Sequence, residues 1–177
     1  MATFTVTNLV DSGTGSFRQA ISDANATSGT DEILFNAGLS GGTINLTSGE
    51  LLVTDDLMIN GLGADLLTVD AGGLSRVFNI DDGVTDSFID VLIDGLTITG
   101  GVGGGRVGEG GGIHTQENLT LTNSTISSNS SGGIANRGGD LTITNSTISD
   151  NNASYGGGIV NIVYTPQKSI PRVKPGS

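Results

Sequence analysis

The sequence predicts an all-β fold in which short parallel strands wind into a solenoid of stacked coils. An eleven-residue phrase occurs twice, as LTLTNSTISSN at 119–129 and as LTITNSTISDN at 141–151, so the two copies lie 22 residues apart. Apolar residues alternate with Thr, Ser and Asn in both copies, which is typical of strands with one buried face. A glycine-led apolar pair precedes each copy, and Gly158 and Ile159 begin a third round. A unit this short cannot bury its apolar side alone, so it must stack on copies of itself.

Stacking places equivalent residues of successive coils above one another, so each asparagine position becomes a column. The predicted columns, or ladders, join Asn123 to Asn145, Asn129 to Asn151, and Asn136 to Asn161. Stacked Asn side chains hydrogen-bond along such a ladder and tolerate the left-handed backbone of tight corners. Some of these asparagines also fit the glycosylation pattern Asn-X-Ser/Thr. The repeat explains their spacing, and we therefore interpret them as structural.

The first forty residues predict a cap for the solenoid. Residues 3–10 alternate like a strand, and the turn that follows ends at Ser16, a suitable N-cap for a helix over 17–26. The apolar face of this helix consists of Phe17, Ala20, Ile21 and Ala24. Ten residues are too few for a helix that is stable in isolation, so the helix must lie on an apolar surface such as the open end of a solenoid. We therefore predict an N-terminal cap over residues 1–40.

Residues 41–161 predict the coils of the solenoid, and the early coils are less regular than the late ones. Strands are predicted at 43–46, 51–53, 56–60, 66–70, 76–80, 88–93 and 95–99. The last of these aligns with residues 123–127 at a shift of 28. The surplus over 22 residues is the glycine tract at 100–112, which we expect to form an outward loop.

The C-terminal segment breaks the repeat. Residues 162–177 contain all three prolines of the chain together with Lys168, Arg172 and Lys174, which predicts an extended or disordered tail. A last coil that nothing covers would offer a surface for self-association.

Residues 1–150 hold all 18 acidic residues but only four of the seven basic ones, a balance that disfavours nucleic acid as a partner. The chain contains no run of 18 apolar residues, so no membrane span is predicted. No N-terminal signal peptide is visible.

These phrases resemble those of a known protein class. Residues 4–35, which begin FTVTNLVDSGTGSFRQAISDAN, resemble the N-terminal module of large bacterial surface repeat proteins. The LTLTNSTIS and GGGI phrases resemble the repeats of right-handed parallel β-helices of the pectate-lyase-like superfold. The resemblance covers residues 3–161. It implies an adhesin-like, secreted or cell-surface protein in which an export or anchoring signal would lie in a C-terminal continuation.

Enzymes of that superfold cleave acidic polysaccharides with clustered carboxylates and a neighbouring basic residue. The available carboxylates are Asp55, Asp56, Asp81, Asp82, Asp86, Asp90 and Asp94, with Arg76 near them in sequence. Asp90 and Asp94 alternate with apolar residues, as outward solubilising residues of a strand do. The chain also lacks the paired-Asp, Gly-His-Gly and Arg-Ile-Lys motifs of the polygalacturonase relatives. We therefore predict no catalytic residues.

Calcium is a further possible ligand. Asp81, Asp82 and Asp86 are the candidates for holding it. Residues 60–68 also match a nonapeptide calcium pattern, but such sites need consecutive copies and this pattern occurs once. We therefore expect no cofactor.

Two further features have simple structural explanations. The only histidine, His114, occupies a position that Ala135 and Val160 hold in later coils, so we expect an exposed filler. Thr97, Thr125 and Thr147 should stack into a hydroxyl strip, and regular threonine arrays on solenoids can bind ice. Outward threonine is also what β-strands favour in general.

Taken together, these features predict a non-catalytic scaffold or adhesion module of a secreted or cell-surface bacterial protein. The main alternative is a β-helix that binds or cleaves polysaccharide, which would bring carboxylates and a basic residue together in an outer groove. An ice-binding face is the third possibility. An extracellular polysaccharide or another cell-surface ligand is the expected partner.

Overall fold

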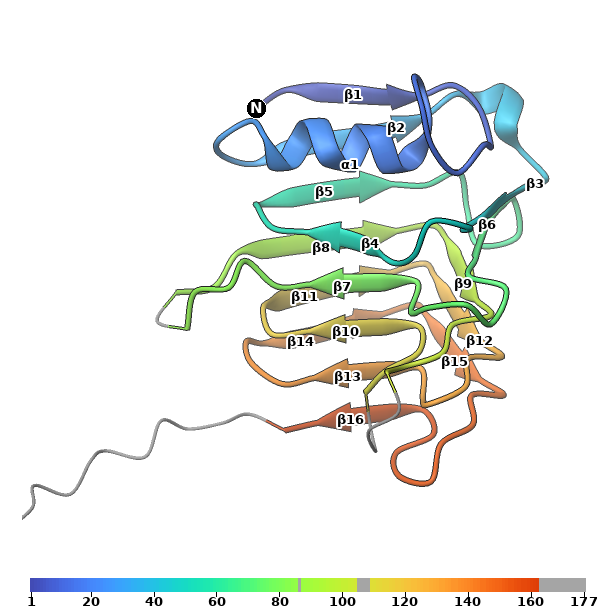
Figure 1. Cartoon of the computed structure of the whole chain (residues 1–177), viewed down its shortest axis with the longest axis vertical. Coiled ribbons are helices and arrows are strands. Elements are labelled where there is room, and N and C mark those ends of the chain that lie inside the picture. The colour runs from blue at the N-terminus through green and yellow to red at the C-terminus, as the bar shows by residue number, and fades with distance from the viewer. Residues whose placement is uncertain (86, 105–108, 163–177) are drawn as a thin grey trace, which may run out of the picture.

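The computed structural model describes residues 1–85, 87–104 and 109–162, and these form a parallel β-solenoid (Figure 1). Their strands belong to three sheets of six, five and five strands. Every pairing between these described strands is parallel. From β2 onwards the chain visits the other two sheets before it returns, and between β1 and β2 it passes through helix α1. The predicted all-β architecture of stacked parallel coils is therefore present.

The strands follow one another in the order of the coils. Sheet A contains β1 (Thr3–Val6), β2 (Asp31–Phe35), β5 (Leu57–Asn60), β8 (Asp90–Asp94), β11 (Asn118–Thr122) and β14 (Leu141–Thr144). Sheet B contains β3 (Gly42–Asn45), β6 (Leu67–Asp70), β9 (Thr97–Thr99), β12 (Thr125–Ser127) and β15 (Thr147–Ser149). Sheet C contains β4 (Leu51–Val53), β7 (Phe78–Ile80), β10 (Ile113–Thr115), β13 (Ile134–Asn136) and β16 (Ile159–Asn161). The helices are α1 (Phe17–Asn25) and the short 3-10 helix η1 (Ala37–Leu39).

The core is a set of apolar columns that run along the solenoid. Sheet A stacks Ile33, Ile59, Ile93, Leu121 and Ile143 in register. Sheet B stacks Ile44, Val69, Ile98, Ile126 and Ile148. Sheet C stacks Leu51, Phe78, Ile113, Ile134 and Ile159. Burying each such side chain stabilises the fold by roughly 1.5–3 kcal/mol, so stability grows with the number of coils that cover one another.

The register is regular although the coils differ in length. Leu119 pairs with Leu141 and Thr97 with Thr125, which are the predicted shifts of 22 and 28 residues. One corner shows why particular residue types recur: Asn123 and Asn145 have φ of 47° and 50°, and Gly95 in the coil before has φ of 64°. Gly adopts this left-handed conformation without steric cost and Asn tolerates it better than most residues, so the corner favours them.

The two ends of the glycine tract at 100–112 are packed between coils. Gly101 and residues 110–112 are buried between coils. The carbonyl oxygen of Gly111 accepts a hydrogen bond from the Val77 N–H, and its own N–H donates to Gly132. A Cβ at Gly111 would overlap the carbonyl oxygen of Ser130, so glycine allows the backbones to approach here. Residues 105–108 lie outside the described residues.

The predicted N-terminal helix is present and ends one residue earlier than expected. The Ser16 hydroxyl caps it by accepting a hydrogen bond from the Gln19 N–H at 3.2 Å. The predicted apolar face is buried. Phe17 packs edge-on against the rings of Phe35 and Phe78, at centroid distances of 4.9 and 6.0 Å. The helix therefore covers the first coil, as a cap must.

Polar side chains of α1 also close the free edge of β4, the first strand of sheet C. The Arg18 guanidinium donates to the carbonyl oxygens of Gly49 and Glu50, both at 2.7 Å. Asn25 donates to the carbonyl oxygen of Leu52 and accepts from the N–H of Thr54, both at 2.9 Å. These bonds replace the neighbouring strand that β4 lacks, so its backbone groups are not left open to another chain.

Asp11 joins this cap to the first coil. Its carboxylate accepts hydrogen bonds from Arg18 at 2.7 Å and from the backbone N–H and hydroxyl of Thr47 at 3.1 Å. Burial opposes ionisation of this carboxyl group, but hydrogen bonds from Ser48, Arg18 and Thr47 outweigh it and lower its pKa from 3.8 to about 2. The charged form is therefore held more tightly in the folded state than in the unfolded chain.

Because the pKa of Asp11 is lowered on folding, its contribution to stability is present above pH 3.8 and is lost as the pH falls toward 2. We expect Asp11→Asn to reduce the free energy of unfolding by about 2 kcal/mol at pH 7, and the difference from wild type to shrink toward pH 2. Urea titrations at several pH values measure this difference. Asp65→Asn, at an exposed acid, is the control. A difference that stays constant with pH would contradict the assignment.

Candidate functional site

The clearest polar constellation is the ladder of Asn129 and Asn151 at the corner between sheets B and C. The Asn129 amide donates to the Asn151 Oδ1 at 2.9 Å, and the Asn129 backbone N–H donates to the same oxygen at 3.0 Å. The Asn129 Oδ1 accepts from the Gly101 N–H at 2.8 Å. Asn129 is 1% exposed, and these bonds join three successive coils. The ladder thus satisfies backbone groups that a tight corner would leave unpaired.

The other two predicted ladders differ from each other. Asn136 donates to the Asn161 Oδ1 at 3.0 Å, as a ladder requires. Asn123 lies one coil before Asn145, and its N–H donates to the Thr144 carbonyl oxygen. Its side chain, however, donates to the Oδ1 of Asp94 in the preceding coil at 2.6 Å. The Asn123 side chain therefore bonds to a carboxylate at the position before the corner, because Asp94 is in register with Thr122.

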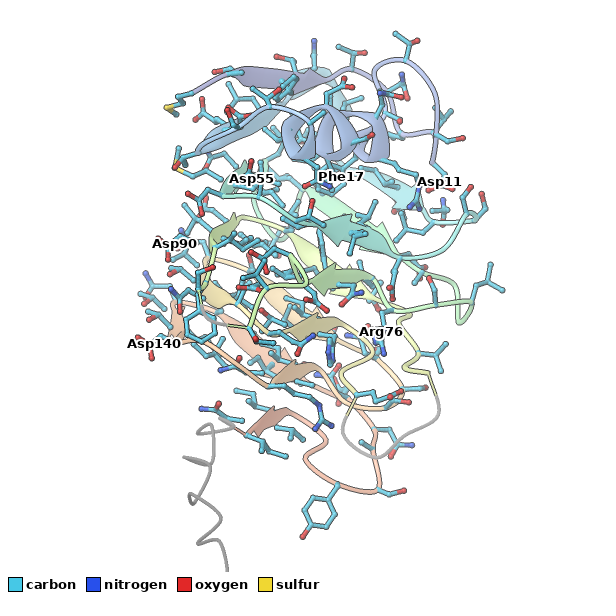
Figure 2. The ribbon with its side chains drawn as sticks, turned by 60° about the vertical axis from the view of Figure 1, so that its left-hand side comes forward. Asp11, Phe17, Asp55, Arg76, Asp90 and Asp140 are labelled. Carbon is cyan, nitrogen blue, oxygen red and sulfur yellow. The ribbon has the colours of Figure 1, made fainter. Side chains whose placement is uncertain are left out.

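A fourth ladder, which the sequence did not indicate, runs along the start of sheet A. The Asp90 N–H donates to Asp56 Oδ1 at 2.8 Å, Asn118 donates to Asp90 Oδ1 at 2.9 Å, and the Asp140 N–H donates to Asn118 Oδ1 at 2.8 Å. Asp90 and Asp140 accordingly lie along the same edge of the stack (Figure 2). The unequal shifts between these coils hide the column from a search for a fixed period.

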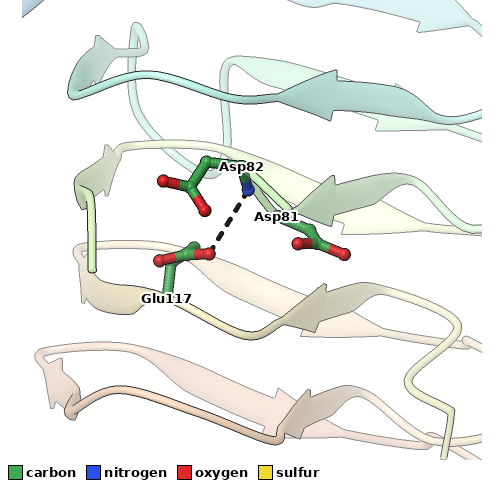
Figure 3. Close-up of side chains that lie close together, drawn as sticks. All are labelled: Asp81, Asp82 and Glu117. Carbon is green, nitrogen blue, oxygen red and sulfur yellow. Dashed lines mark hydrogen bonds between the residues drawn. The ribbon is translucent and has the colours of Figure 1, made fainter. Parts of the chain in front are cut away.

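A group of three carboxylates forms where sheet C leads into sheet A. Ligand oxygens of Asp81, Asp82 and Glu117 lie within 4.8 Å of one another (Figure 3). Glu117 is fully buried. It was not among the residues that the sequence suggested, because it lies just before β11, 35 positions after Asp82 in the sequence. Asp86, the third calcium candidate, lies outside the described residues.

The chain itself already supplies partners to these carboxylates. The Glu117 oxygens accept from the N–H groups of Asp82 at 3.3 Å and Ile89 at 3.1 Å, and Asp82 accepts from Val84 at 2.7 Å. Burial raises the pKa of Glu117, although the two N–H donors favour its charged form. Calcium takes six to eight oxygen ligands. Asp82 and Glu117 therefore have partners within the chain, and calcium at this corner stays a prediction.

A second polar cluster lies on the outer side of sheet C. Arg76 pairs with Glu50 at 3.1 Å and with Glu109 at 3.7 Å, and Asn79 donates to Glu50 at 2.9 Å. A pocket of about 200 Å³ beside them is lined by Glu50, Leu74, Ser75, Arg76, Val102, Gly103 and Gly104. Arg76 Nε and Asn79 Oδ1 are buried without a hydrogen-bond partner among the described residues. Arg76 thus pairs with residues of neighbouring coils rather than with Asp81 or Asp82.

His114 belongs to the same side of sheet C and is not the exposed filler that the sequence suggested. Its register with Ala135 is as expected, and Ala135 pairs with Val160 in turn. The ring is half-buried, with Nδ1 3.3 Å from the Glu109 carbonyl oxygen. Burial and the nearby Arg76 charge lower the pKa of His114, so the neutral imidazole is favoured.

The threonine strip of sheet B is longer than the sequence repeat indicated. Its column comprises Thr43, Thr68, Thr97, Thr125 and Thr147, one from each strand of the sheet. The Thr97 hydroxyl donates to the Ala64 carbonyl oxygen at 2.7 Å, so one member of the strip bonds to a loop. Ice binding by this face stays a prediction.

Comparison with protein families, curated proteins and solved structures finds no match for the chain. The fold therefore defines only a broad class, the parallel β-solenoids. Among the described residues no helix has the length and apolar character that spanning a membrane requires.

The Asn129 ladder leads to a direct test of its contribution. Asn129→Ala would leave the buried Gly101 N–H without its acceptor, so we expect the free energy of unfolding to fall by about 3 kcal/mol. Asn152→Ala, at an exposed asparagine beside the ladder, is the matched control and should change stability by less than about 0.5 kcal/mol. Urea titration of both variants measures the effect. Equal losses in the two variants would contradict a special role for the ladder.

Proposed function

We propose that this chain is a non-catalytic scaffold or adhesion module, in which the solenoid holds surface residues at fixed spacing. The observation that carries the proposal is the continuity of the stack. Three sheets and their inward columns run through successive coils, and side-chain ladders tie the corners. Such a body resists bending because each coil is bonded to both neighbours. The role needs no cofactor.

Three finer features belong to the same proposal. The coil is right-handed, because connections between parallel strands of one sheet almost always are. The chain is related to the right-handed β-helices of the pectate-lyase-like superfold, as its repeated phrases suggest. It acts outside the cell or at a bacterial cell surface. Its acidic composition and Thr-rich strands suit a hydrated spacer in that setting.

A scaffold should show no turnover of the polysaccharides that enzymes with this fold cleave. We expect that incubation with polygalacturonate or alginate, with calcium present, releases neither unsaturated uronates nor new reducing ends. Absorbance of the unsaturated product and a reducing-end assay measure this. Turnover that is lost in Arg76→Gln would overturn the scaffold role and establish catalysis.

A second candidate function, polysaccharide binding without cleavage, is supported by the cluster on sheet C. Carboxylates of Glu50 and Glu109 converge there with the basic Arg76 beside a pocket, which is the arrangement expected of a saccharide groove. A second hollow of about 240 Å³ also includes Glu50 and reaches Leu52 and Arg18 of the cap. The two hollows therefore adjoin along the same side of the solenoid.

Calorimetric titration with acidic oligosaccharides tests this second function. If the groove binds them, Arg76→Gln should weaken binding about tenfold or more, because Arg76 supplies the positive charge beside the pocket that an acidic saccharide would pair with. Asp65→Asn, which changes one exposed carboxylate elsewhere, should leave the affinity unchanged. Absence of binding by the wild-type chain would exclude this candidate.

A further inference from the structure

The C-terminal end of the described solenoid exposes residues that are buried in every other coil. Ile159 is 40% exposed, whereas Ile134, directly before it in the same column, is 0% exposed. Leu141, Ile143 and Ile148 are likewise only partly buried, unlike their equivalents in the preceding coil. Figure 1 shows this coil, with β16, at the end of the stack opposite α1. No described residue pairs with the outer edges of β14, β15 and β16.

This end also carries little charge. The sequence from 141 to 162 contains one charged residue, Asp150, although the whole chain has 18 acidic and seven basic residues. Interfaces between proteins are depleted of charge at their centres. A strongly basic or acidic partner would therefore form few ion pairs with this coil, whereas an apolar surface like that of the coil itself could pack against it.

The N-terminal end of a second copy does not offer such a surface. Helix α1 turns its apolar residues inward and its polar residues outward. Arg18 and Asn25 already occupy the backbone groups at the edge of β4. A head-to-tail stack would therefore place Ile159 against polar side chains. The backbone groups at the edge of β4 would not be free to pair with β16 of the other copy.

We propose that two copies of this chain associate through their C-terminal coils, end to end about a two-fold axis. The two-fold axis brings the partly buried Leu141, Ile143, Ile148 and Ile159 of both copies together. It also pairs open strand edges in antiparallel orientation, which satisfies backbone groups that are otherwise open. The inference does not depend on the scaffold role, because it concerns only the coil that nothing described covers.

Sedimentation equilibrium of the full chain over a range of concentrations tests the proposal. We expect a reversible monomer–dimer equilibrium that tightens as salt is added, because salt screens the repulsion between two chains of charge −11. Ile159→Lys should raise the dimer dissociation constant about tenfold or more, since it buries a charge without a partner.

Leu34→Lys is the matched control, because Leu34 is 37% exposed but lies on the outer side of sheet A. It should leave the dissociation constant within about twofold. Thermal melts show whether both variants fold. A monomer at every concentration would overturn the proposal. A dimer equally sensitive to both substitutions would overturn it too, because association would then use another surface.

Discussion

Hydrogen bonding between successive coils is the interaction on which the rest of this structure depends. A single coil orders some twenty residues and buries only a few Leu and Ile side chains, which is too little to offset the entropy that ordering removes. Parallel pairing gives every coil two neighbours that complete its backbone bonds, and the same register stacks its apolar residues into columns. Corners, ladders and caps then follow from one requirement, which is that no backbone group between coils remains unpaired.

The late coils could be predicted from sequence because their repeat is exact enough to fix the register. The shift from Leu119 to Leu141 and the capped helix beginning at Phe17 each follow from local patterns. The early coils could be located but not aligned, because the step from Phe78 to Ile113 includes two excursions of irregular length. The glycine tract shows a related limit: its composition suggests a loop but does not reveal that the small size of Gly111 lets two coils approach each other.

The polar sites were harder to predict, for a physical reason. A ladder needs only an oxygen acceptor at each level, so Asp90 can serve where the next coil has Asn118, and this alternation of residue types breaks the sequence signal. Glu117 joins Asp82 through a fold contact between different coils, which no local pattern encodes. Arg76 is near the acidic residues in sequence, yet its carboxylate partners are Glu50 and Glu109 on neighbouring coils.

A distance measurement along one column tests the stacked arrangement most directly. Thr5 and Thr144 are exposed on sheet A, five pairing steps apart through Leu34, Asn60, Asp94 and Thr122. The chain has no cysteine, so Thr5→Cys and Thr144→Cys place two spin labels cleanly. Parallel coils about 4.8 Å apart predict a narrow distribution with roughly 24 Å between the two backbones. A broad distribution, or a separation far from this value, would contradict the account.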